Sequence, residues 1–301
     1  MRYGWAFLPS AAAILTLLFS TASSSFAGSA TWKQRTIPNG PGDTATFASS
    51  NQTSIDIVFD TEVSGIVFKP GASAFAIATN PQVTPELTIS GVGVTNNSGI
   101  VQNFVVNQGA AQILFANSAT AGSLTAFTNT GTITFSGTST AGNATFTNNS
   151  FVNFTNTSTA GGATFTNNSV LIFDGSSTGG NGTFTNNGGL VIFSGIPDII
   201  APTAGDSTFT NSDGGFIIFN SGTAGNATFV NNGGAVSDAL GAETLFNDIG
   251  DAGNATLIAN GGLDGGEGGS IQFATASTGG TARVEVFGNG NLDISVHDAR
   301  A

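Results

Sequence analysis

The stretch AGNATFTNNS, residues 141–150, decides the fold because close variants of it recur along the chain. It returns as AGGATFTNNS at 160–169, then as GGNGTFTNNG at 179–188, AGDSTFTNSD at 204–213 and AGNATFVNNG at 224–233. Self-similarity at a near-constant period is the signature of a repeat architecture, in which each unit packs on the next. The question is whether the motif serves chemistry or architecture.

Two sets of phenylalanines define the repeat. The first is the Phe of TFTN, with Leu257 in its place in a weaker copy, at spacings of 19, 19, 19, 25, 20 and 28: Phe127, Phe146, Phe165, Phe184, Phe209, Phe229. The second closes a short apolar run: Phe115, Phe135, Phe154, Phe173, Phe193, Phe219, Phe246, Phe273. Because the two sets drift together, each repeat contains two short strands joined by turns.

Each strand alternates apolar and polar residues, the pattern of one buried and one exposed face. Gly, Thr, Asn and Ser disfavour helix, and no 3.6-residue apolar period is present. The repeat is too short for a propeller blade and lacks the leucine pattern of leucine-rich repeats. The sequence therefore predicts an all-β parallel β-helix (solenoid) of about 19–27 residues per coil with an N-terminal cap, its Phe residues stacked inside.

In six copies of the repeat, the position two residues after the Phe of TFTN is an asparagine. We expect these side chains to form a ladder between coils, at corners where Asn tolerates the left-handed conformation. The glycines of AGN and NGG are expected at the same corners. The ladder positions are Asn129, Asn148, Asn167, Asn186, Asn211 and Asn231.

Composition excludes several functions. The chain has 301 residues, a net charge of −12, no cysteine and only 8% charged residues. No Lys or Arg lies between Lys69 and Arg283, so the central coils cannot neutralise phosphates. We expect no nucleic-acid partner and no cofactor or metal.

The N-terminus predicts export. Arg2 precedes the apolar run AAAILTLLF, and SFA ends at Ala27 with small residues suited to signal-peptidase cleavage. The alternative is an uncleaved anchor. We divide the chain into a Sec-type signal peptide (1–27), an N-terminal cap with irregular coils (28–108) and regular repeats (109–301), with Trp32 in the cap and no membrane insertion after cleavage.

The outward positions offer two candidate surfaces. Thr145/Thr147 and their equivalents in three further repeats would form two Thr columns, an arrangement that can bind ice, although Thr is also simply a good exposed strand residue. On the other sheet, an apolar stripe is expected to pack against a partner or a second copy. The stripe consists of Ile172, Ile192, Ile218 and Leu245.

The strongest catalytic hypothesis is a glycan-active enzyme, a polysaccharide lyase or hydrolase, which needs paired carboxylates or a basic proton acceptor. The only histidine is His297, and we interpret the central acidic residues as solvated surface charge: Asp174, Asp198, Asp206, Asp213, Asp238, Glu243, Asp248, Asp251. GGLDGGEGGS at 261–270 lacks the Asp that a calcium-binding nonapeptide requires, and we interpret it as a glycine-rich loop.

The chain resembles the repeat-bearing passenger regions of bacterial autotransporter-type proteins. The resemblance rests on the signal peptide, on IPNGPGDTATF at 37–47 after a Trp, on LTISGVGVTNNSGIVQNF at 87–104 and on the AGNATF coils. It implies export to the cell surface or medium and a β-helical stalk or adhesive surface. Such proteins also carry a C-terminal membrane barrel. The sequence ends in NLDISVHDARA without one, so we expect a truncated autotransporter or a secreted protein of similar repeats.

These observations predict an exported, non-catalytic structural or adhesive module that recognises a surface ligand or glycan. The motif AGNATFTNNS specifies a shape, and binding is expected on the outer faces of the coils.

Overall fold

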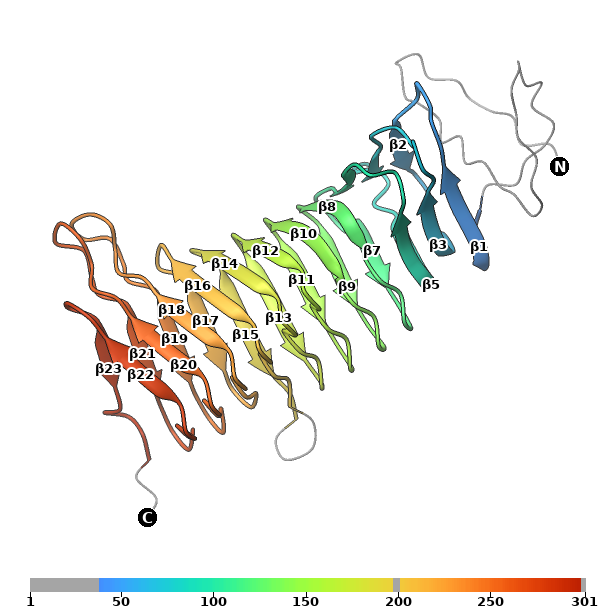
Figure 1. The fold of residues 1–301 in the computed structure, drawn as a ribbon. Coiled ribbons are helices and arrows are strands. Elements are labelled where there is room, and N and C mark those ends of the chain that lie inside the picture. The colour runs from blue at the N-terminus through green and yellow to red at the C-terminus, as the bar shows by residue number, and fades with distance from the viewer. Residues whose placement is uncertain (1–37, 197–200, 299–301) are drawn as a thin grey trace, which may run out of the picture.

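The computed structural model describes residues 38–196 and 201–298. They form an all-β parallel solenoid of about 11 turns, with about 22 residues per turn and no helix in these ranges. The chain winds so that successive strands alternate between two sheets, and each strand pairs in parallel with its equivalent one coil away (Figure 1). The predicted fold class is therefore confirmed.

Sheet A contains the twelve odd-numbered strands, each joined to the next by parallel pairing. They are β1 (Gly40–Phe47), β3 (Thr61–Phe68), β5 (Glu86–Asn96), β7 (Gln112–Phe115), β9 (Thr132–Phe135), β11 (Phe151–Phe154), β13 (Val170–Asp174), β15 (Leu190–Ser194), β17 (Phe216–Phe219), β19 (Glu243–Phe246), β21 (Ser270–Phe273) and β23 (Asn291–Asp293).

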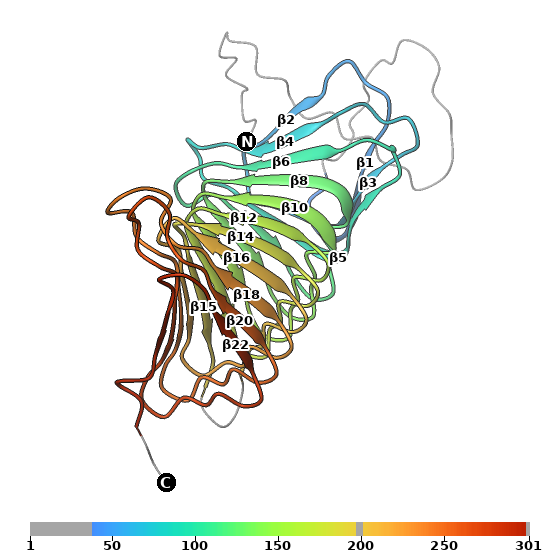
Figure 2. The same cartoon turned by 60° about the vertical axis from the view of Figure 1, so that its left-hand side comes forward.

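Sheet B contains the eleven even-numbered strands, which follow one another along the solenoid (Figure 2). They are β2 (Ser54–Ile57), β4 (Ala76–Thr79), β6 (Gln102–Val106), β8 (Ser123–Asn129), β10 (Asn143–Asn148), β12 (Thr164–Asn167), β14 (Thr183–Asn187), β16 (Thr208–Ser212), β18 (Thr228–Asn231), β20 (Thr256–Ala259) and β22 (Arg283–Val286). The strands β1–β6 of the irregular N-terminal region thus continue both sheets.

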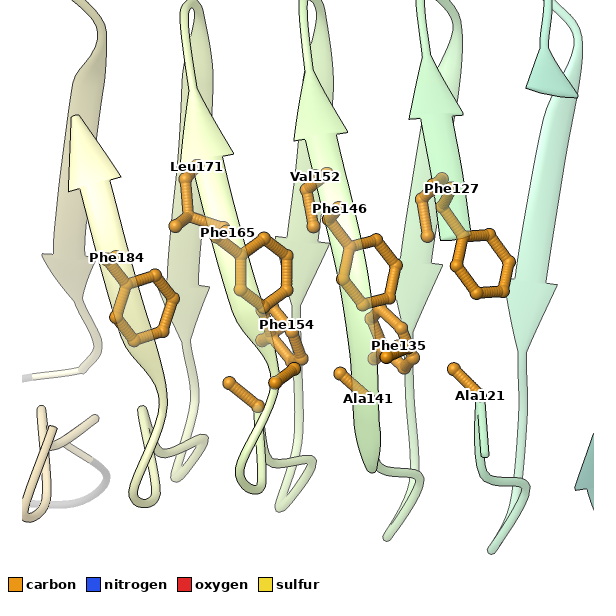
Figure 3. Close-up of a cluster of buried hydrophobic side chains, with 14 of the residues drawn as sticks. Ala121, Phe127, Phe135, Ala141, Phe146, Val152, Phe154, Phe165, Leu171 and Phe184 are labelled. Atoms are coloured by element: carbon orange, nitrogen blue, oxygen red, sulfur yellow. The ribbon is translucent and has the colours of Figure 1, made fainter. Parts of the chain in front are cut away.

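Two columns of stacked phenylalanine rings run through the core, alongside buried Ala, Val, Leu and Ile side chains (Figure 3). Along the TFTN column, neighbouring rings from Phe127 to Phe229 lie 4.4–5.1 Å apart and nearly parallel. The second column packs edge-on against the first, as between Phe154 and Phe165, whose ring centroids are 6.0 Å apart at 73°. Leu257 follows Phe229 in register and ends the first stack. Each stacked or edge-to-face ring pair contributes about 0.5–1.5 kcal/mol of stability beyond that of burying the rings.

A third position per coil completes the cross-section. Isolated parallel bridges join Thr120, Thr140, Thr159, Thr178, Thr203 and Thr223, the Thr residues of TAG or TGG. In each, the hydroxyl accepts the N–H of the Gly two residues later, at 3.0–3.1 Å. At Gly142, φ is 63°, and an added Cβ would lie 2.5 Å from the carbonyl oxygen of Gly122. This corner therefore requires glycine, because L side chains avoid that conformation and no space is left.

Candidate functional surfaces

The asparagine ladder lies inside the molecule. Each ladder Asn from Asn129 to Asn211 donates its side-chain N–H to the Oδ1 of the Asn in the next coil, at 2.7–2.9 Å, and Asn231 is the last acceptor. All six side chains are fully buried. The amides also donate to backbone carbonyls of sheet A, as from Asn148 to Val170 at 2.9 Å. The ladder thus joins the two sheets and is unavailable to an external ligand.

The expectation that these asparagines adopt the left-handed conformation is wrong. Each of them is a strand residue of sheet B with its side chain directed inward, and none has positive φ. The left-handed Asn residues are Asn117 and Asn156, with φ of 55° and 57°, in the turns that follow sheet A. The physical reason is that each buried amide is hydrogen-bonded to the Asn of the neighbouring coils and to the backbone of sheet A, which requires an extended strand residue. The left-handed conformation is adopted by residues of the turns instead.

The predicted apolar stripe forms one column on the outer face of sheet A. Ile172, Ile192, Ile218 and Leu245 pair in register across β13, β15, β17 and β19. All four are half-buried, with one face toward solvent.

A second apolar column, which the sequence analysis missed, runs beside the stripe. Its members are Phe151, Val170, Leu190 and Phe216, in register across β11, β13, β15 and β17. Phe151 has 49% of its surface exposed. Strand alternation gives the signal that was overlooked: Val170, Leu190 and Phe216 each lie two residues before a stripe residue and so share its face. We call the eight side chains of both columns the apolar band.

Polar residues bound the apolar band at both ends. On its N-terminal side, Thr132 and Asn153 occupy the two columns, and on its C-terminal side, Glu243 and Gln272 follow Phe216 and Leu245. These polar residues confine the band to a patch.

Burial raises the pKa of the Glu243 carboxyl, and the nearby negative charge of Asp293 raises it further. The pKa of Asp293 is lowered, chiefly by the backbone N–H and then the hydroxyl of Ser295.

Glu243 and Asp251 correct the interpretation of the central acids as solvated charges. Glu243 is a half-buried strand residue of β19, not a turn residue. Asp251 replaces Thr in the corner bridges, where it accepts the Gly253 N–H at 3.0 Å and the Thr278 hydroxyl at 2.6 Å. A carboxylate fits there because it can accept both bonds at once. Asp198 lies outside the described residues.

The threonine columns lie on the outer face of sheet B. Thr145, Thr164, Thr183 and Thr208 pair in register, and so do Thr147, Thr166, Thr185 and Thr210. The first column is exposed and the second is half-buried. Val230 and Ile258 interrupt the second column at β18 and β20. The result is an uncharged array of eight hydroxyls on four adjacent strands.

One hollow gathers carboxylates. It lies near the N-terminal end of sheet A and is lined by Asn39, Asp60, Thr61, Glu62, Glu86 and Thr88. The carboxylate of Glu86 already accepts bonds from Thr88 and Gln112, and that of Asp60 accepts the Glu86 N–H at 2.9 Å. In residues 38–196 and 201–298, no three His, Cys, Asp or Glu side chains are arranged to hold a metal ion.

The comparisons with known proteins identify no family, so the class of this protein is defined by its fold alone. No family model matches this chain, and no curated protein or solved structure is significantly similar to it. The structure defines a parallel β-solenoid repeat protein. The two outer faces of the solenoid carry its candidate binding surfaces.

Proposed function

We propose that this chain is an exported, non-catalytic structural or adhesive module that binds through the apolar band of sheet A. The observation that supports this proposal is the band itself: eight apolar side chains in two adjacent in-register columns, of which Phe151 is exposed and the other seven are half-buried. Contiguous exposed apolar patches with a polar border are typical of binding surfaces.

The size of the band favours weak, repeated contacts. Strands lie about 4.8 Å apart and alternate residues of one strand about 6.6 Å apart, so the band covers on the order of 250 Å². A stable pairwise interface buries about 800 Å² per partner. A single band therefore supports only weak association, which becomes effective when many copies are displayed together. We propose the same band on a neighbouring copy as its occupant.

The setting that suits such a module is the outside of a bacterial cell. The predicted signal peptide, residues 1–27, lies outside the described residues and remains the reason for proposing a secreted or cell-surface protein. The absence of cysteine and the resemblance to autotransporter passengers agree with that setting. In the described part of the chain, no helix is long and apolar enough to cross a membrane.

The double variant Ile192→Thr with Ile218→Thr tests the proposal. Both residues lie in the middle of the band, and Thr keeps the strand propensity of the site. We expect self-association at high concentration and binding of a hydrophobic dye to fall several-fold, with circular dichroism unchanged. The matched control is Thr185→Ser with Thr210→Ser, on the opposite sheet of the same coils. Unchanged association and dye binding in the Ile variant would refute the proposal.

A glycan-cleaving enzyme is the second candidate, and the carboxylate hollow is the observation that favours it. Glu62 and Glu86 share one side of sheet A there, and paired carboxylates perform glycoside hydrolysis. If the chain were such an enzyme, Glu62→Gln would abolish release of reducing sugar from a panel of acidic and neutral polysaccharides. We expect no release from the unaltered chain, because the carboxylates of Glu86 and Asp60 are engaged by neighbouring groups.

The in-register Thr array on sheet B favours ice binding as a third candidate. Growth of single ice crystals in the presence of the chain would be shaped and arrested, and Thr166→Tyr in the centre of the array would remove the effect. Arrest that is equally strong in the Tyr variant would exclude the array as its cause.

A further inference from the structure

Two long turns project from the edge where the chain passes from sheet B to sheet A (Figure 1, orange). They are residues 232–242, between β18 and β19, and residues 260–269, between β20 and β21, whereas the equivalent turn between β10 and β11 is only 149–150. The ends of each long turn meet. Ala242 donates its N–H to the Asn232 carbonyl at 2.9 Å, and a bond of the same kind, 2.8 Å long, closes the second turn. Compact loops with adjacent ends are frequently functional. We call these two turns the loop platform.

The two turns pack against each other through their backbones. Leu263 donates its N–H to the Gly234 carbonyl at 2.8 Å, and Gly234 donates its own N–H to the Glu267 carbonyl at 2.8 Å. A Cβ at Gly241 would lie 1.9 Å from the carbonyl oxygen of Gly268, so glycine is required at this contact. The motif GGLDGGEGGS is thereby explained, because its glycines allow one loop to lie directly on the other. A platform that is ordered before its ligand arrives lowers the entropy cost of binding.

The loop platform exposes three large apolar side chains. The exposed fraction is 60% at Val236, 62% at Leu240 and 65% at Leu263, higher than at any member of the apolar band. The turns on either side, 213–215 and 287–290, both belong to the described residues and are short, so neither covers the three side chains. Apolar side chains grouped in water in this way mark an interaction site.

Every charged side chain of the loop platform is acidic. Asp238 lies on the first turn, Asp264 and Glu267 lie on the second, and all three are exposed. The regular repeats contain no Lys or Arg before Arg283, and that side chain is ion-paired with Glu285. A second copy of the platform would place like charges opposite these carboxylates, which is unfavourable. The complementary partner is therefore cationic.

We propose that the loop platform binds a cationic peptide segment with apolar side chains, carried by another protein. The apolar side chains of that segment would cover Val236, Leu240 and Leu263, and its Lys or Arg side chains would lie against the three carboxylates. In interfaces with an apolar centre and a charged rim, complementary charges raise the association rate and apolar contacts slow dissociation. The loop platform is separate from the apolar band, so this inference does not rest on the proposed function.

The probe is a short synthetic peptide of alternating Lys and Leu, labelled for fluorescence anisotropy. We expect it to bind the full chain, and we expect peptides with Ser in place of Leu, or Glu in place of Lys, to bind at least about tenfold more weakly. Binding should weaken as salt is raised from about 0.05 M to about 0.5 M, because the carboxylates are exposed. No binding of the Lys–Leu peptide, or equal binding of all three peptides, would overturn the proposal.

The variant Val236→Ser/Leu263→Ser tests the apolar contacts by removing one apolar side chain from each turn. Both side chains are exposed, so circular dichroism should be unchanged. We expect the dissociation rate of the Lys–Leu peptide to rise about tenfold. The matched control is Ile192→Thr/Ile218→Thr in the apolar band, which should leave the peptide's binding unchanged. Loss of binding in the band variant alone would place the peptide on the band and overturn the proposal.

The variant Asp264→Asn/Glu267→Gln tests the charges. We expect the association rate of the peptide to fall about fivefold and its salt dependence to shrink, with the dissociation rate nearly unchanged. The control is Asp174→Asn/Asp206→Asn, which removes two exposed carboxylates that lie outside the platform. An equal fall in the association rate in both variants would show only an effect of net charge, contrary to the proposal.

Sedimentation velocity separates this site from the proposed function. Self-association should fall in the band variant and stay unchanged in Val236→Ser/Leu263→Ser. Self-association that is lost in Val236→Ser/Leu263→Ser would identify a second copy as the occupant of the loop platform and overturn the proposal. Failure of the peptide to bind leaves the proposed role of the band untouched.

Discussion

The side-chain N–H of Asn148 donates to the Oδ1 of Asn167 at 2.7 Å, and both residues are fully buried in successive coils. The same bond recurs from coil to coil, so every internal member of the ladder is both donor and acceptor. Buried amides in such chains polarise one another and are costly to interrupt. The repeated TFTN motif is thereby explained by packing between coils.

Interrupting the ladder should destabilise the protein strongly. Asn167→Ala removes the acceptor of Asn148 and the donor to Asn186. We expect the free energy of unfolding, measured by denaturant titration, to fall by about 2–4 kcal/mol. The control is Asn168→Ala, whose amide makes an exposed bond of 2.7 Å to Asn149 and should cost less than about 0.5 kcal/mol. Equal losses in the two variants would show that the ladder contributes no special stability.

Removing one ring from the stack should create a cavity. Phe165 lies 4.4 Å from Phe146 and 5.1 Å from Phe184, measured between ring centroids. Phe165→Ala is expected to lower the free energy of unfolding by about 3–5 kcal/mol. Phe165→Leu should cost clearly less, because Leu257 occupies the same column in the native chain. A Leu variant as unstable as the Ala variant would contradict this account.

The buried serines provide a prediction of the opposite sign. The hydroxyl of Ser158 is buried and makes no hydrogen bond within the described part of the chain. Ala119 occupies the equivalent place before Thr120, which shows that the column accepts Ala. We expect Ser158→Ala to leave the free energy of unfolding unchanged or to raise it by up to about 1 kcal/mol.

The control for this prediction is the next residue, Thr159. Its hydroxyl accepts the Gly161 N–H at 3.0 Å, so Thr159→Ala should lower the free energy of unfolding by about 1 kcal/mol. A loss at Ser158 as large as the loss at Thr159 would reveal a hydrogen bond to the Ser158 hydroxyl.

Glu243 should make stability depend on pH. Its pKa is raised by burial and by Asp293, so the folded chain binds this proton more tightly than the unfolded chain. The linked contribution to stability is fully present below the unfolded pKa and is lost as pH rises through the folded value. We expect Glu243→Gln to raise the melting temperature at pH 7 and to leave it nearly unchanged at pH 3.

The matched control for the pH experiment is Glu267→Gln, on an exposed loop, which should alter the melting temperature little at either pH. A Glu243 variant that is less stable than the unaltered chain at pH 7 would mean that the carboxylate forms a favourable contact in its charged form.

Much of the core followed from the alternation within each strand. In ATFT, Ala144 and Phe146 point inward and Thr145 outward, and the structure has the same arrangement. The parallel solenoid followed because only stacked coils place equivalent Phe residues in contact. The sequence predicted only one of the two columns of the apolar band. The equivalence of Ile192 between coils was recognised, but the outward position of Leu190, two residues earlier on the same strand, was not.

The sequence predicted the Asn ladder between coils but not where in each coil it lies. The sequence TNN is typical of a turn. Only the hydrogen bonds to neighbouring coils show that Asn148 ends a strand with its amide inside the solenoid. The burial of Glu243 likewise depends on what surrounds β19.

The sequence by itself determined the period, the inward and outward faces and hence the parallel solenoid, because strand alternation and turn residues act within a few neighbours. Only the tertiary structure decided which outward residues of different coils meet. Strands separated by 19 to 28 residues come into register once the longer turns loop out, so Phe151, Val170, Leu190 and Phe216 become one column.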